Sequence, residues 1–216
     1  MKRTVSWSLI LTAAVALVAS GCASSRKKTT PELSNYEGKK VALVEVEGES
    51  TQTAIVEVAL VNQLIKRGTF ILVSKKEIDQ ARTQVGTDTS DWKAFAKAAG
   101  ADIALRAKVI QFDADTHEGY SSEIVDDSQM AAERGEAHRK VEKVFKVKAL
   151  RGRVQVELQF ATLTGDNAGD LRYAVAQANE DVQESANKSA IHLPPKLRFL
   201  EKLTNQAFAK FFDQYN

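Results

Sequence analysis

The spacing of hydrophobic residues in the first half of the chain predicts strands alternating with helices. Short runs with apolar residues on both faces indicate strands of a covered sheet, and stripes recurring every three to four residues indicate amphipathic helices. The expected strands are residues 39–46, 70–73 and 101–112, and the expected helices are 54–67, 75–84 and 91–99. Ser50 or Thr51 is expected to cap the first helix, and Gly68 to end it. This alternation is typical of an α/β fold.

The pattern changes to period two in the second half, which predicts a β-hairpin. Apolar residues alternate over 145–149 and again, on the opposite parity, over 154–160. Gly152 lies between the two runs, so a bulge or kink is expected there. Turn-forming residues at 164–169 then lead into a returning strand around 171–175. The hairpin completes a mixed sheet with helices packed on it.

A final amphipathic helix is expected after Pro194 and Pro195. Its apolar face consists of Leu197, Leu200, Leu203, Ala207, Phe208, Phe211 and Tyr215. Phe199 and Phe212 lie at the edges of this face, where they can belong either to the core or to a subunit contact. Trp92 and Phe95, on a short helix, are expected in the core.

Residues 113–153 form a charged insertion. The stretch 113–136 is strongly acidic, and the stretch 137–153 is strongly basic. Opposite charges so close in sequence can pair with one another across a hairpin. Alternatively, one block stays open and binds a partner of opposite charge, which would raise the association rate and make it salt-sensitive. The sequence leaves both interpretations open.

The start of the chain has the pattern of an export signal. A basic start precedes an apolar run over 5–18, which at about 14 residues is shorter than the roughly 20 that a membrane span needs. Ser20 and Gly21 then precede Cys22, the single cysteine of the chain. This resembles the lipobox of bacterial lipoproteins, in which small residues precede a lipid-modified cysteine. An ordinary secretory signal and a retained membrane anchor are the alternatives.

The lipobox resemblance implies an anchor and a location. Residues 1–21 would be removed, and Cys22 would carry diacylglyceryl and N-acyl chains such as palmitate, enough for stable anchoring. Residues 22–38 would form a flexible tether, on the order of 50 Å when fully extended, and residues 39–216 a periplasmic domain. Ala23 is not the aspartate that retains many lipoproteins in the inner membrane. The periplasmic face of the outer membrane is therefore expected.

The order of elements also resembles a known periplasmic domain. It is similar to the domain shared by CsgG-type curli-secretion lipoproteins, lipoprotein activators of penicillin-binding proteins, and the amino-terminal domain of TolB. The residues that carry the resemblance are 41–44, 64–68, 70–74, 76–79, 100–102 and 154–165. The resemblance implies the α/β fold. It does not select one member's function, because fold does not fix function.

Composition and motifs argue against catalysis. The 30 basic and 28 acidic residues give a net charge of +2, so nothing calls for a nucleic-acid partner. The densest titratable group, which could bind a hard metal ion, is Asp113, Asp115, His117 and Glu118. It is expected where a strand meets an exposed loop, and the other histidines, His138 and His192, are isolated. We therefore expect no metal, no cofactor and no enzyme.

The functional expectation is a non-enzymatic adaptor or assembly factor for envelope or secretion machinery, held by lipid on Cys22 near an envelope protein partner. One alternative is a ring-forming component of a CsgG-type outer-membrane secretion channel, which implies a homo-oligomer. Charged residues within 113–153 disfavour membrane-inserted strands there. A second alternative is a metal-binding or hydrolytic periplasmic domain using residues such as Asp115 and His117.

Overall fold

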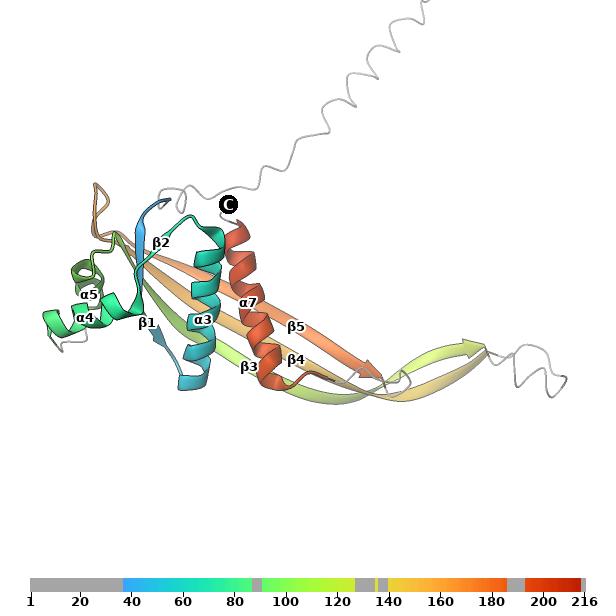
Figure 1. The fold of residues 1–216 in the computed structure, drawn as a ribbon. Helices are drawn as coiled ribbons and strands as arrows, with labels where there is room; N and C mark the ends of the chain where they lie inside the picture. Colours follow the sequence, from blue (N-terminus) through green and yellow to red (C-terminus); the bar gives the residue numbers. More distant parts are fainter. Residues whose placement is uncertain (1–36, 87–90, 127–134, 136–139, 186–192, 215–216) are drawn as a thin grey trace, which may run out of the picture.

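The computed structural model describes residues 37–86, 91–126, 135, 140–185 and 193–214. A five-stranded mixed sheet in the order β2-β1-β3-β4-β5 lies at its centre (Figure 1). The strands are β1 (Lys40–Glu47), β2 (Ile71–Leu72), β3 (Ile103–Asp126), β4 (Lys140–Thr162) and β5 (Leu171–Ser185). The helices are α3 (Ser50–Arg67), α4 (Lys75–Val85), α5 (Trp92–Ala98) and α7 (Lys196–Gln214). The α/β class predicted from the hydrophobic pattern is confirmed.

Helices cover both faces of the sheet, but not equally. On one face, α3 and α7 pack side by side over most of the sheet and enclose the larger core (Figure 1). On the other face, α4 and α5 cover only the end formed by β1 and β3, around a smaller core. The apolar face predicted for the last helix is confirmed at Leu200, Leu203, Ala207, Phe208 and Phe211, which are all buried. Leu197, at the start of the helix, is instead 52% exposed, and Tyr215 lies outside the described residues.

Two of the helix ends follow local sequence signals. Gly68 ends α3 in the left-handed conformation at φ 63°, as expected. The Ser74 hydroxyl accepts the Glu77 N–H while the Glu77 carboxylate accepts the Ser74 N–H, which forms a capping box at the start of α4. The expected cap at Ser50 or Thr51 is wrong, because the helix has already begun at Ser50. Glu49 is the N-cap residue, without a side-chain capping bond.

β2 differs from the buried strand predicted over 70–73. It has two residues, pairs in parallel with Lys40 and Val41, and forms an edge of the sheet. The Ile71 side chain is 54% exposed, because no described strand lies outside it. The apolar run over 70–73 therefore predicted the position of this strand correctly, but the prediction that the strand is buried is wrong at Ile71.

β3 and β4 are much longer than the sequence suggested. β3 does not end at residue 112 but pairs with β4 continuously to Asp126↔Lys140. The charged segment 113–153 is therefore largely the distal part of one antiparallel hairpin.

The register shift in this ladder lies between Val109 and Gln111, and the ladder has no bulge at Gly152, where a bulge or kink was predicted. Gly152 is instead where α7 approaches the sheet. A Cβ atom there would lie 2.6 Å from both Phe199 Cε1 and Leu203 Cδ1.

Arg67, the last residue of α3, ties that helix to the end of α7. Its guanidinium donates to the carbonyl oxygens of Ala209 and Phe212, pairs with the Asp213 carboxylate at 2.7 Å, and stacks on the Phe212 ring. Carbonyl groups at a helix C-terminus lack partners within the helix, so a cation there satisfies and stabilises them. The contact fixes the two helices that cover the larger core.

Candidate protein-binding surface

The distal β3–β4 hairpin projects beyond the rest of the sheet (Figure 1). Pairing with β1 ends at Glu47↔Lys108, and pairing with β5 ends at Val147↔Ser185. Beyond Val147 only two strands remain, and the first two ladder pairs at the base of this hairpin still lie beside the end of β5. We call residues 118–126 of β3 and 140–148 of β4 the β-ribbon. At about 3.3 Å per residue, its nine paired positions span roughly 30 Å.

Opposite charges pair across the β-ribbon. The Glu118 carboxylate lies 2.6 Å from Lys146 Nζ and 3.4 Å from Lys148 Nζ, and Glu123 stands directly opposite Lys143. The hydrogen bond from Lys146 lowers the pKa of Glu118, and the same bond raises the pKa of Lys146. The interpretation that the acidic and basic blocks pair with each other is confirmed for Glu118 with Lys146 and Lys148. Such exposed pairs contribute little stability.

Exposed apolar side chains gather on one face of the β-ribbon. Tyr120 is 79% exposed, Ile124 70% and Val144 64%. Tyr120 stands opposite Lys146, and Val144 stands opposite Ser122, one step before Ile124 on the same side. Because directly opposed residues share a face, the three side chains lie on one face of the β-ribbon, with Val144 diagonal to both of the others, and we call them the apolar patch. Sequence reasoning missed it, although Tyr120 and Ile124 stand at alternating positions that share one face of a strand.

The suspected metal-binding group lies within β3, not at a strand end. Asp113, Asp115 and His117 do alternate on one face, but they stand opposite Arg153, Arg151 and Ala149. The expectation of an exposed loop at this point is wrong, because the ladder continues past it. Among the described residues there is no group of three or more His, Cys, Asp or Glu side chains placed to hold a metal ion.

Several residues singled out from the sequence are core residues. Phe199 and Phe212 are 1% and 2% exposed, which excludes a direct role in a subunit contact in this structure. Trp92 and Phe95 are buried residues of α5, as predicted.

Three other predicted positions, Cys22, His138 and His192, lie outside the described residues. Within the described part of the chain, no helix is long and apolar enough to cross a bilayer.

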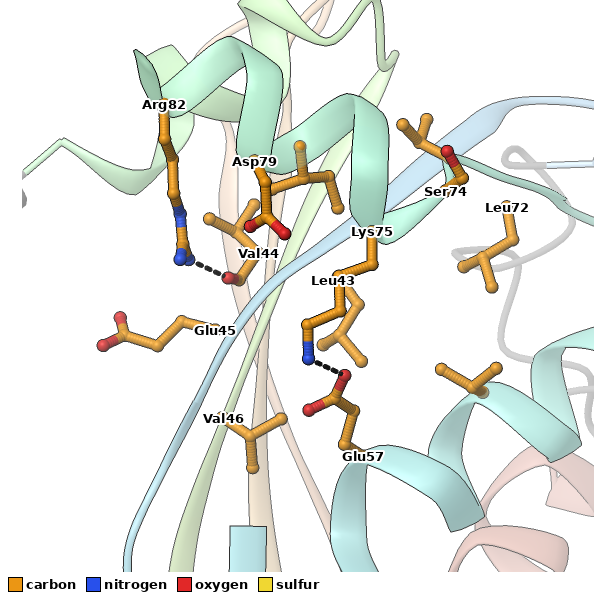
Figure 2. Close-up of a pocket in the computed structure, with 13 residues that line it drawn as sticks. Leu43, Val44, Glu45, Val46, Glu57, Leu72, Ser74, Lys75, Asp79 and Arg82 are labelled. Carbon is orange, nitrogen blue, oxygen red and sulfur yellow. Dashed lines mark hydrogen bonds and ion pairs between the residues drawn. The ribbon is translucent and has the colours of Figure 1, made fainter. Parts of the chain in front are cut away.

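A second candidate site is a cleft at the carboxyl ends of the parallel strands β1 and β2 (Figure 2). The crossover after β1 runs over one face of the sheet and the crossover after β2 over the other, so α3 and α4 separate and leave a cleft of about 440 Å³. Such switch points often bind ligands in open α/β sheets. The apolar floor of the cleft includes Leu43, Val46 and Ile78.

Both cationic side chains that line this cleft are already engaged with the protein. Lys75 Nζ lies 2.8 Å from the Glu57 carboxylate and bridges α4 to α3, and the Arg82 guanidinium donates to the Val44 carbonyl (Figure 2). The hydrogen bond to Glu57 raises the pKa of Lys75. A polar ligand would have to separate the Lys75–Glu57 pair, so the cleft is a weaker candidate site than the β-ribbon.

Comparison with known proteins finds only distant structural likeness. No protein-family model matches the chain. No curated protein matches it either. Lipoprotein GNA1162 from Neisseria meningitidis superposes with a TM-score of 0.37 at 11% identity, covering 82% of this chain and 99% of that one. The LpoB C-terminal domain from Salmonella enterica gives 0.36 at 12% identity, covering 73% and 95%.

A minor lipoprotein from Acinetobacter baumannii gives a TM-score of 0.32 at 10% identity, covering 82% of this chain and 90% of that one. With likeness this low, the functional argument depends on this chain's own residues.

Proposed function

We propose that this chain is an outer-membrane lipoprotein whose periplasmic domain is a non-enzymatic adaptor that binds an envelope protein through the β-ribbon. The observation that carries the proposal is the apolar patch of Tyr120, Ile124 and Val144 on a projecting two-stranded element. Exposed apolar groups gathered on one face and rimmed by charge are typical of protein-binding surfaces. Here the rim is formed by Glu118, Lys146 and neighbouring charged residues.

The pairing of opposite charges on the β-ribbon supports a protein partner over a polyanion. Where Lys146 and Lys148 already pair with Glu118, little net charge remains to attract a polyanion. Association would then depend mainly on the apolar patch, with tyrosine as the side chain best suited to anchor it. Rim charges would tune the rate and the choice of partner more than the affinity.

Lipid on Cys22 supplies the second half of the proposed mechanism. The described domain begins with the Gly38 N–H donating to the Thr69 carbonyl, next to the first strand. A tether over 22–38 keeps the domain within tens of ångströms of its membrane. A modest intrinsic affinity for a membrane-associated partner is then raised by a high effective concentration.

Site-specific photocrosslinking in intact cells tests the contact. A photoreactive amino acid at Val144 is expected to form an adduct with one envelope protein. The same residue at Val58, a valine of similar exposure on α3 (59% against 64%), is expected to form none. The proposal holds if crosslinking at 120 and 124 follows that at 144 and captures the same protein. Equal adducts at 58 and 144, or none at any ribbon position, would contradict it.

A further inference from the structure

The outer edge of β5 is long and carries few of the features that block pairing with another strand. β5 is the last strand of the sheet and has 15 residues, and no described strand pairs with its outer side. Natural edge strands are usually short, or interrupted by proline, lysine or a bulge. β5 contains neither proline nor lysine, and its ladder with β4 runs from Leu171 to Ser185 without a register shift.

Charges along β5 are distributed asymmetrically. Arg172, near its start, is the only cation in the strand and lies 3.9 Å from the Asp170 carboxylate just before it. The acids of the strand lie between residues 180 and 184. Two of these acids have partners within the protein: Glu180 lies 2.7 Å from Lys202, and Asp181 lies 3.2 Å from Arg151. For the third, Glu184, no ion pair is found among the described residues. A strand with one positive and one negative end is complementary to an antiparallel copy of itself.

We propose that two copies of this chain associate by antiparallel pairing of their β5 strands about a two-fold axis at Ala178. This register places Arg172 of each copy opposite Glu184 of the other, on the same face of the sheet. It also pairs Leu171 with Ser185, so the whole strand is used. Only this register brings Arg172 opposite Glu184. It also places the two-fold axis at the middle residue of the strand, so that all fifteen residues pair.

Side chains near the axis fit this arrangement. On the face covered by α7, Ala176 and Ala178 are small and are 1% and 6% exposed. They leave room for the backbones to approach. On the other face, Gln177 of one copy would stand opposite Asn179 of the other, where their amides can hydrogen-bond. The result is one continuous ten-stranded sheet.

The contact differs from a ring-forming one. A two-fold interface uses the same surface on both copies and therefore closes as a dimer. The part of the β-ribbon beyond Val147 does not lie beside it, because β5 ends there, at the base of the ribbon. The inference is thus independent of the proposed function, and the dimer presents two β-ribbons pointing away from each other.

Reversing the charges of Arg172 and Glu184, singly and together, tests the proposed pairing of the two β5 strands. The full-length protein in detergent is expected to give the molar mass of a dimer by light scattering, after subtraction of the detergent. Arg172→Glu and Glu184→Arg each place like charges opposite one another twice, and each is expected to raise the dimer dissociation constant roughly tenfold. The double variant restores opposite charges and is expected to recover the wild-type value within a few-fold.

Lys66→Glu, an exposed change on α3 away from the edge, is the matched control and should leave the dimer unchanged. Circular dichroism checks that every variant is folded. A monomeric wild-type protein, a larger ring, or single variants that dimerise like the wild type would overturn the inference. Failure of the double variant to recover would overturn the Arg172–Glu184 register. None of these outcomes bears on crosslinking through the β-ribbon.

Discussion

Gly152→Ala is expected to destabilise the domain strongly, and Gly152→Val more so. A Cβ atom at this position would lie 2.6 Å from atoms of both Phe199 and Leu203, which are 1% and 0% exposed in the larger core. Neither side chain can move without disturbing the contact of α7 with β4. Overpacking of this kind typically costs about 1–3 kcal/mol, occasionally more. Urea unfolding, followed by circular dichroism, measures the loss in the free energy of unfolding.

The second glycine inside these strands provides the control. Gly119 lies in the β-ribbon, and a Cβ atom there would meet nothing closer than Val147 Cγ2 at 3.9 Å. Gly119→Ala is therefore expected to leave stability unchanged or raise it by a few tenths of a kcal/mol, because it restricts the unfolded chain. If Gly152→Ala unfolds at the same urea concentration as Gly119→Ala, the close approach of α7 is wrong.

Export without the lipid attachment site is expected to release the protein from the membrane. The change replaces residues 1–22 by an ordinary cleavable signal, so that the secreted domain begins at Ala23. Each buried CH₂ of an acyl chain contributes about 0.8 kcal/mol to membrane binding, and removal of all chains leaves only weak electrostatic attraction. Cell fractionation should show nearly all of the variant in the periplasm and nearly all of the wild type in membranes.

Two controls separate the anchor from its sorting. Intact-mass analysis of the wild type should give a chain beginning at Cys22 with its acyl groups attached. By the sorting pattern of bacterial lipoproteins, Ala23→Asp should keep the lipid but move the protein to the inner membrane. A wild-type chain without acyl groups, or a released variant that stays in the membrane, would contradict the anchor.

Local sequence signals predicted the first half of the fold well. Gly68 ends α3 because a left-handed terminal residue favours glycine, and the apolar stripe of α7 follows the helical period. β2 was placed correctly but expected to be buried, because apolar content alone does not distinguish an edge strand from a central one. The role of Gly152 was not predictable, because a strand glycine marks either a bulge or a close contact, and only the position of α7 decides between them.

The candidate site was half predictable. Adjacent blocks of opposite charge indicated that the two blocks could pair across a hairpin, and Glu118 and Lys146 do so. The length of β3 was not predicted, since charged residues from Asp113 onward resemble a loop when the partner strand is unknown. Tyr120 and Ile124 were overlooked for the same reason: an apolar face becomes visible only after the strand is extended through them.

The most direct test of the account is native purification of a full-length variant with a shortened β-ribbon. Residues 119–147 are replaced by an Asn-Gly turn that joins Glu118 to Lys148, its directly opposed partner in the ladder. This variant is expected to fold and stay in the membrane but no longer to copurify with the protein captured through Val144. Retention of that same partner at the wild-type level would contradict it.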